Sequence, residues 1–336
     1  MAAVQLTPEE ESLLARRPRS LWRDSLQRLM RNKLAVIGGG YVILLILVAI
    51  FADKIAPYDY ATQNLKANNA VPSYLMWIMP KNAENYATVD NHYPLGADYL
   101  GRDLLSRAIY GARVSLAIAV VASLVSLTIG LVYGTISGYV GGAADSVMMR
   151  VVDFLYGFPF LIVVILLQTY FKAWAREGAS GGLAAVILDW NAKMGGMLLL
   201  FIAIGLVNWI GMARLARGQV LAYKEKEFVE AARSVGASHM RIIFRHLIPN
   251  VIGPLIVAET LAIPGYIFTE AFLSFIGLGV DPPTPSWGIM ISEGVQNLRA
   301  YPLQTLVPAF ALSLTTLAFN FLGDGLRDAF DPRMAE

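Results

Sequence analysis

The sequence predicts an all-α polytopic membrane protein with six transmembrane helices. Of its 336 residues, 56% are hydrophobic and only 15% are charged, whereas an average soluble domain has about 25% charged residues. Six stretches are long and apolar enough to cross a bilayer, which requires about 20 residues in a helix. This composition argues against a soluble enzyme and excludes a disordered chain, because disordered chains are poor in apolar residues.

The six predicted spans are separated by polar or glycine-rich segments. The third is interrupted by Pro159, and the fifth contains Glu259 and Glu270 together with three prolines. A further apolar run at 178–188 is too short to span and is predicted to be interfacial or a loop. The predicted spans are 34–52, 114–144, 154–171, 194–213, 247–280 and 300–323.

Basic residues set the predicted orientation of these spans. Most of the 27 Lys and Arg residues lie before the first span, after the second, between the fourth and fifth, and after the sixth. Loops rich in Lys and Arg stay on the cytoplasmic side. Six spans place both termini on one side of the membrane, so we expect both termini to be cytoplasmic.

The predicted organisation divides the chain into five segments. Residues 21–33 have helical spacing of apolar side chains and form either an amphipathic helix on the cytoplasmic leaflet or a frayed tail. The segments are a cytoplasmic tail with this interfacial helix at 1–33, the first span at 34–53, an external loop with a second interfacial helix at 54–113, a five-helix core at 114–325 that includes a cytoplasmic loop at 214–250, and a cytoplasmic tail at 326–336.

The cytoplasmic loop between the fourth and fifth spans carries the most information. Residues 224–235 predict a helix with Phe228, Ala231, Ala232 and Val235 on one face. Gly236 suits a left-handed cap at its end, and the following segment predicts a second short helix that runs into a proline. A short, part-apolar helix presented in this way suits insertion into the groove of a partner protein.

This loop resembles the "EAA" signature of ABC importer permeases. The signature is carried by Glu230-Ala231-Ala232, then Gly236, then His246-Leu247-Ile248-Pro249. The resemblance implies a coupling helix that docks on a cytoplasmic ATPase subunit; the alternative is an ordinary basic loop. The residues implied in the ATPase interface are Lys226, Phe228, Glu230, Ala231, Ala232, Arg233, Gly236, His246 and Pro249.

Two other stretches narrow the resemblance to the C-type subunit of dipeptide, oligopeptide and nickel importers. They are the segment from Tyr93-Pro94-Leu95-Gly96 to Tyr110-Gly111-Ala112-Arg113, and the segment 270–288. The resemblance implies the MetI-like fold of type I ABC importers in a prokaryotic plasma (inner) membrane.

The same resemblance implies the partners and cofactors of the chain. It implies half of a heterodimeric pathway for peptides, completed by a second permease, driven by two cytoplasmic ATPases and supplied by an external binding protein. This chain would not be an enzyme and would bind no cofactor or metal directly. ATP and Mg²⁺ would be bound by the partner subunits, because the glycine runs of this chain lack the Gly-Lys-Ser/Thr of a phosphate-binding loop.

Residues 100–113 also have a physical interpretation of their own. Their apolar stripe predicts a helix at the outer interface before the second span, with polar residues on the opposite face and an i,i+4 pair between Asp103 and Arg107. Trp287 follows a proline-rich outer loop and is predicted to anchor at the interface. The outer segments 60–91 and 172–193 are long, and we hypothesise that they contact the binding protein or the partner permease.

Three polar residues in the spans are candidates for the translocation cavity. Glu259 lies near the middle of the fifth span, and Asn208 and Trp209 either face the pathway or pack within the protein. An ionisable group at this depth is costly and is often functional; Glu270 lies nearer the outer boundary and is expected to pair there. The rival functions are a stand-alone transporter or channel that uses Glu259, and an intramembrane enzyme.

Overall fold

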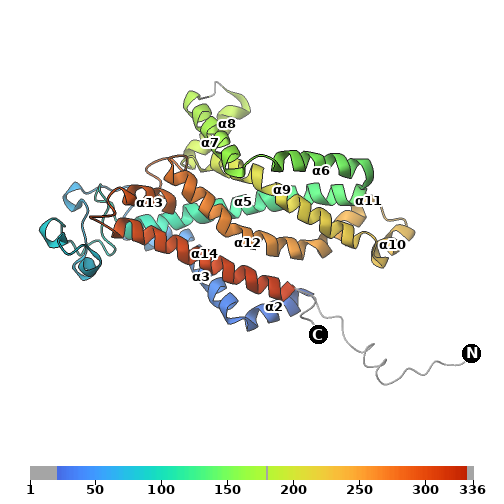
Figure 1. Ribbon diagram of the computed structural model, residues 1–336, viewed down its shortest axis with the longest axis horizontal. Helices are drawn as coiled ribbons and strands as arrows, with labels where there is room; N and C mark the ends of the chain where they lie inside the picture. Colours follow the sequence, from blue (N-terminus) through green and yellow to red (C-terminus); the bar gives the residue numbers. More distant parts are fainter. Residues whose placement is uncertain (1–20, 179–180, 331–336) are drawn as a thin grey trace, which may run out of the picture.

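Long apolar helices run side by side along the molecule (Figure 1). The structure is a computed structural model that describes residues 21–178 and 181–330. Within these residues, five helices are long and apolar enough to cross a membrane, and a sixth span arises if one bent helix pair is counted. The predicted all-α membrane fold is therefore confirmed. The five helices are α3 (Lys33–Ile50), α5 (Leu104–Val140), α9 (Met197–Tyr223), α12 (Ile248–Phe275) and α14 (Leu303–Phe330).

The third predicted span, which Pro159 was expected to interrupt, belongs to a bent pair of helices. Helix α6 (Gly142–Tyr156) and helix α7 (Phe160–Glu177) meet at 81°. Pro159 lies in extended conformation just before α7, and its ring disfavours a helical residue before it, so α6 cannot continue. The apolar run predicted to be interfacial or a loop forms much of α8 (Gly182–Lys193), and α7 and α8 project from the side of the bundle (Figure 1).

Helix α5 is continuous, and the predicted interfacial helix with a turn before the second span is wrong. Asp103 caps α5 by accepting a hydrogen bond from the Ser106 amide at 2.7 Å, and no proline follows within the helix. At 1.5 Å per residue, its 37 residues extend roughly 55 Å. Since the hydrocarbon core is about 30 Å thick, part of α5 lies beyond the bilayer.

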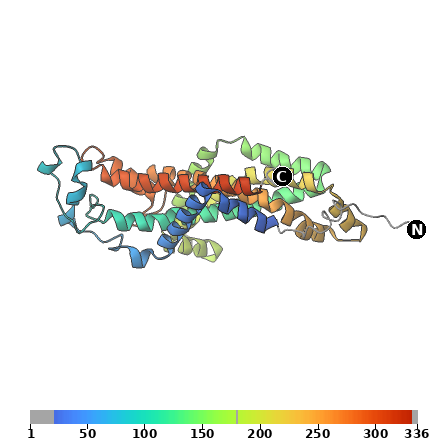
Figure 2. The ribbon, with the colours of Figure 1, turned by 90° about the horizontal axis from the view of Figure 1, so that it is seen from below.

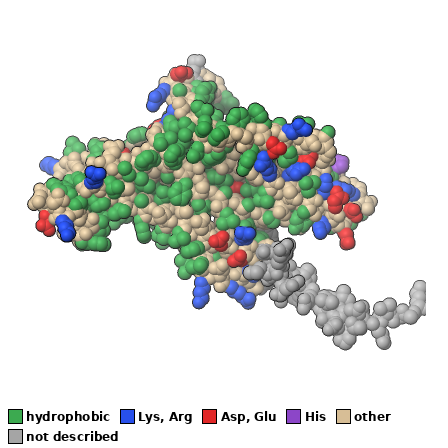
Figure 3. All heavy atoms as spheres, in the orientation of Figure 1, with side chains coloured by type: hydrophobic (Ala, Val, Ile, Leu, Met, Phe, Trp, Pro, Cys, Tyr) green, Lys and Arg blue, Asp and Glu red, His purple; other side chains and the backbone are tan. Residues whose placement is uncertain are grey.

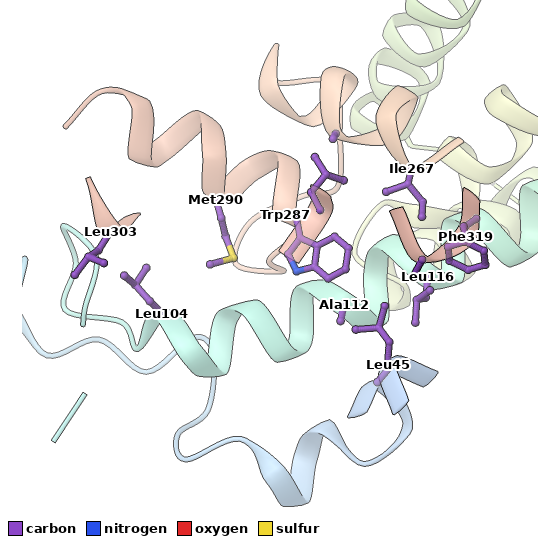
Figure 4. Close-up of a cluster of buried hydrophobic side chains, with 14 of the residues drawn as sticks. Leu45, Leu104, Ala112, Leu116, Ile267, Trp287, Met290, Leu303 and Phe319 are labelled. Atoms are coloured by element: carbon purple, nitrogen blue, oxygen red, sulfur yellow. The ribbon is translucent and has the colours of Figure 1, made fainter. Parts of the chain in front are cut away.

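One hydrophobic cluster joins α3, α5, α12, α14 and the short α13 (Trp287–Val295) (Figure 4). Trp287 is 1% exposed and its indole Nε1 donates to the Ala108 carbonyl at 3.0 Å. Gly111 makes this possible, because a Cβ there would be 3.0 Å from the indole ring. Trp287 is therefore a core residue, and the prediction of an interface anchor is wrong.

Close backbone contact joins α5 to α9. A Cβ built on Gly134 would lie 2.2 Å from the Ala213 carbonyl oxygen, and one built on Gly130 would lie 2.5 Å from the Met212 side chain. Small residues at such positions let two helices approach and pack in a membrane, where lipid supplies no hydrophobic driving force between them. Helices α5 and α9 therefore form one tightly packed unit.

Residues 56–103 form the loop-rich end of the molecule, opposite α10 (Figure 1). Its short 3-10 helices are η1 (Leu65–Ala67), η2 (Ser73–Ile78) and η3 (Ala83–Asn85). A group of ions, which we name the Asp98 cluster, consists of the buried Asp98, Arg102 and Arg107 and the half-buried Glu293. Most of the predicted polar face is therefore buried, and the predicted pair is wrong, because Arg107 pairs with Asp98 and Glu293 rather than with Asp103.

The middle of the molecule and its α10 end differ in the polarity of their surfaces (Figure 3). Hydrophobic side chains cover much of the middle of the visible face, whereas charged side chains gather toward the α10 end. Helix α2 (Leu21–Arg31) packs against α3 and α14, and Figure 2 shows it beside the last turns of α14. Its helical form agrees with the amphipathic helix predicted for 21–33, while its place on a membrane stays a prediction. Residues 1–20 and 331–336 of the predicted tails lie outside the described residues.

Candidate functional site

Helix α10 (Glu227–Ser234) lies beyond the end of α9, and its C-terminus has the predicted cap. Gly236 has a φ of +78°, and its N–H donates to the Arg233 carbonyl at 2.9 Å. The next N–H, of Ala237, donates to the Ala232 carbonyl at 3.0 Å. These two bonds form a Schellman motif, which satisfies the last carbonyls of the helix. The helix is shorter than the predicted 224–235, because residues 224–226 form a turn.

The second helix after Gly236 does not stop at the proline. Ser238 accepts the Arg241 N–H at 3.4 Å, and α11 (His239–Arg241) leads into a π-helical segment, η4 (Ile242–Leu247). Pro249 then lies in the first turn of α12. Proline lacks the N–H for a regular helical bond and clashes with the carbonyl four residues earlier; the wider π-helical turn before it accommodates the ring. The prediction of a separate short helix is therefore wrong, since α12 continues from it.

Helix α10 has two faces with different environments. Val229 and Ala232 are buried, in a cluster with residues of α9, η4 and α12. Phe228, Ala231 and Val235 are exposed, and 85% of the Val235 surface is accessible. Ala232 therefore belongs to the inward face, contrary to the predicted single stripe. The outward face is apolar at three positions and has no covering residue in the described chain.

Contacts with α5 and the loop after α10 fix the position of this helix. The Tyr139 hydroxyl and the His239 Nδ1 are 2.7 Å apart, and the Arg233 guanidinium carbon lies 5.9 Å from the centre of the Tyr139 ring. A basic cavity of about 410 Å³ adjoins it, lined by Ala232, Val235, Ala237, Arg241, Arg245 and His246. Of the predicted interface residues, Lys226, Glu230 and Pro249 are exposed and His246 is half-buried.

Ion pairs join α6 to α9 near the same end. The Arg217 guanidinium donates two hydrogen bonds to Asp145, from Nε at 2.6 Å and from Nη2 at 2.5 Å. Arg214 donates to Asp153 at 2.7 Å. A bidentate Arg–carboxylate pair fixes geometry as well as charge, so these contacts hold α6 in place against α9.

The three candidate cavity residues lie in different environments. Asn208 lines a cavity of about 460 Å³ between α9 and the break after α6. Trp209 packs against the Tyr133 ring at 4.9 Å. Glu259 is buried, and its carboxylate accepts hydrogen bonds from Tyr266 at 2.7 Å and Ser126 at 3.2 Å. The structure thus places only Asn208 on this cavity, and the roles of all three stay predictions.

Glu270 is also buried among hydroxyl groups. Its carboxylate accepts hydrogen bonds from Ser274 at 2.6 Å and from Ser115 at 3.1 Å, and Ser286 donates to Ser274 at 3.2 Å. The expected pairing near the outer loop therefore consists of serines from α5, α12 and the loop before α13. No basic residue in the described part of the chain forms an ion pair with it.

Sequence reasoning missed the aromatic residues at the break between α6 and α7. Tyr156, Phe158 and Phe160 line the cavity with Asn208. They belong to the stretch that was predicted as the third span, interrupted by Pro159. The signal was Gly157 and Pro159 beside three aromatics, a pattern that favours a break with exposed rings.

Comparisons with known proteins identify the family. Residues 126–336 match the family model described as the binding-protein-dependent transport system inner membrane component. Residues 20–72 match the model of the N-terminal TM domain of oligopeptide transport permease C. The chain belongs to the family of binding-protein-dependent transport system inner membrane components, and it is a multi-pass membrane permease.

Curated relatives are similar over nearly the whole chain. The oligopeptide transport system permease protein OppC of Bacillus subtilis is 39% identical over 96% of this chain and 92% of its own length. OppC of Escherichia coli strain K12 is 40% identical, covering 94% and 92%. The dipeptide transport system permease protein DppC of Bacillus subtilis is 39% identical, covering 94% and 87%. A solved structure of the MetNI methionine ABC transporter in inward-facing conformations matches 66% of this chain and 96% of that chain, at 17% identity and a TM-score of 0.46.

Proposed function

We propose that this chain is one permease subunit of an ATP-driven ABC importer for peptides. The observation that carries the proposal is the outward face of α10, where Phe228, Ala231 and Val235 are exposed beyond the ends of the spans. An exposed apolar helix face held in place by its buried face fits a groove in a partner. In a family member, that partner is a cytoplasmic ATPase subunit.

The charge distribution supports the proposed orientation. The α10 end contains Lys224, Lys226, Arg233, Arg241 and Arg245, and segments rich in basic residues remain cytoplasmic. With six spans, both termini then lie in the cytoplasm, and the loop-rich end faces outward toward a binding protein.

The packing of α10 gives the coupling step its physical basis. Val229 and Ala232 contact the same buried cluster as Val220 of α9 and Leu247 before α12. Movement of α10 therefore moves α9 and α12, and α5 follows because Gly134 brings it against α9. ATP shifts the equilibrium only if the ATPases hold α10 differently in their two states. The α10 loop is then the rigid link between ATP binding and the direction in which the pathway opens.

The cavity beside Asn208 is the best candidate for a surface of the pathway. It has aromatic side chains, an amide and an opening toward the outside of this chain, which suits peptide backbone and side chains. A second permease would cover this surface and complete the pathway. The peptide cargo is supported by the names of the relatives, which are oligopeptide and dipeptide transport permeases. ATP and Mg²⁺ belong to the ATPase subunits, and this chain serves as a non-catalytic subunit.

Purification of the chain with its native neighbours tests the proposal. A complex with a second six-span protein and two ATPase subunits, whose ATP hydrolysis rises with binding protein and peptide, is the expected result. Transport by this chain alone that collapses with the proton gradient would instead favour a stand-alone transporter that uses Glu259. Turnover of a substrate by the purified chain would favour an intramembrane enzyme.

A further inference from the structure

A second polar cavity lies under the arm formed by α7 and α8. Its volume is about 210 Å³, and it is enclosed by α7, α8, the start of α9 and the loop after α12. Three of its wall residues, Gln168, Asn191 and Leu199, are at most 5% exposed. Lys172, Arg176 and Asp281 are more accessible and form its rim.

Hydrogen bonds between separate segments build this cavity. The Asn191 Oδ1 accepts the Leu199 N–H at 3.0 Å, which holds α8 to the first turn of α9. The Asp281 N–H donates to the Gly195 carbonyl at 2.9 Å. Gly196 has a φ of +82°, and a Cβ there would be 2.6 Å from the Asp281 carboxylate. The wall is therefore fixed by α8, α9 and the loop together.

Hydrogen-bond donors from α7 line one side of the cavity. Gln168, Lys172 and Arg176 are four residues apart, so they share one helix face. The Lys172 Nζ is 3.1 Å from Asp281, whereas no described residue forms an ion pair with Arg176. The Gln168 amide oxygen is buried without a hydrogen-bond partner among the described residues. Because this oxygen makes no hydrogen bond, a half-turn of the side-chain amide would break none there, and Gln168 can present its NH₂ group to a ligand.

The outer surface of the arm is apolar. Leu166, Tyr170, Leu183, Val186 and Trp190 are all at least half exposed, and green side chains cover much of the arm in Figure 3. A polar, net basic cavity under an apolar surface requires a ligand with an anionic group and a hydrocarbon part. A phospholipid has both properties, whereas free phosphate esters have only the first.

We propose that this cavity binds the phosphate of a phospholipid headgroup. Arg176 and Lys172 contact the phosphate, and the Gln168 amide donates to it. The Asp281 carboxylate on the rim accepts hydrogen bonds from the ammonium group of an ethanolamine headgroup. The headgroup ammonium then replaces Lys172 as the partner of Asp281. Phosphatidylethanolamine therefore binds better than a lipid without the ammonium. The site is independent of the cargo and of α10.

Native mass spectrometry of the full chain, purified with its accompanying subunits, tests this site. The protein is titrated with phosphatidylethanolamine, with phosphatidylglycerol, and with water-soluble phosphoethanolamine. Wild type is expected to retain one phosphatidylethanolamine at least tenfold more tightly than phosphatidylglycerol. Arg176→Ala, an exposed position whose change leaves the fold intact, is expected to weaken this binding about tenfold.

Lys193→Ala provides the matched control. Lys193 lies on α8 of the same arm, pairs with Asp189 and does not line the cavity, so its removal should leave lipid retention unchanged. Equal retention by Arg176→Ala and wild type would overturn the site. Equal loss in both variants would show a general charge effect and would also overturn it. Tight binding of phosphoethanolamine without retention of the lipid would overturn the lipid as its ligand.

Discussion

Replacing Asp98 by Asn tests whether the Asp98 cluster holds the loop-rich end to the bundle. The Asp98 carboxylate accepts hydrogen bonds from Arg102 Nε at 2.7 Å and from Arg107. Glu293 of α13 accepts from the same two arginines at 3.1 and 2.7 Å. The two carboxylates balance the two guanidinium groups. Asp98→Asn keeps the shape but leaves one positive charge uncompensated on Arg102 and Arg107, which are at most 5% exposed, whereas the remaining carboxylate, Glu293, is 23% exposed.

The expected cost is large because the charges are buried. Removing one partner of a buried ion pair costs about 3–5 kcal/mol, which corresponds to more than about 100-fold in an opening equilibrium. Hydrogen–deuterium exchange measures that equilibrium. The amides of Ala97 and Leu104, which bond to the carbonyls of Ala70 and Gly96, should exchange about 100-fold faster in the variant.

Asp53→Asn is the control for this prediction. Asp53 pairs with Arg113 in the same region, but both side chains are exposed. Hydrogen bonds from Arg113 and Tyr110 hold the pKa of Asp53 below its usual value of 3.8, yet exposed pairs contribute little to stability. Exchange should therefore change little. If Asp98→Asn accelerates exchange no more than Asp53→Asn, the reasoning about the buried cluster is wrong.

Four further predictions follow from the described contacts. Gly236→Val should uncouple ATP hydrolysis from peptide uptake because it strains the cap of α10. Glu230→Lys should do the same because it reverses a charge on the outer face of this helix. Coupled transport in both variants would exclude the role of α10. Gly134→Leu should lower the free energy of unfolding by about 1–3 kcal/mol through overpacking against α9. The control Gly218→Leu should leave it unchanged, because the space around Gly218 is open. Thermal unfolding in detergent measures both. Deleting 178–188 should weaken the stimulation of ATPase activity by binding protein, and unchanged stimulation would count against contact there. Burial raises the pKa of Asp103, although hydrogen bonds from Ser106 oppose the shift. The folded state therefore binds the Asp103 proton more tightly than the unfolded state does, and Asp103 contributes less to stability as pH rises above about 4. Asp103→Asn should reduce the pH dependence of amide exchange at the start of α5.

Local signals were sufficient for the C-terminal cap of α10 at Gly236 and for the N-cap of α11 at Ser238. Gly236 and Ser238 act on their own neighbours in sequence, so their roles could be read without knowledge of the fold. The same holds for the long spans, whose apolar length is a local property. Hydropathy therefore predicted the number of spans, which is six if the bent pair α6 and α7 counts as one span.

Burial by distant segments could not be predicted in the same way. Arg107 and Trp287 look like surface residues by type and position, but α13 folds back over α5 and encloses both. Ala232 and Phe228 lie on adjacent turns of an amphipathic helix, and only the packing of η4 decides which of them is covered. Residues of the candidate site whose burial depends on segments distant in sequence could therefore be assigned only from the structure.

The continuity of α5 gives the molecule a mechanical axis. One uninterrupted helix begins beside the Asp98 cluster and ends beside Tyr139, which bonds to His239 next to α10. A helix held at both ends transmits displacement along its length without rearranging internally. In the proposed importer, a partner bound at the loop-rich end and one bound at α10 would therefore contact the same helix, and a displacement of α5 at one end would reach the other.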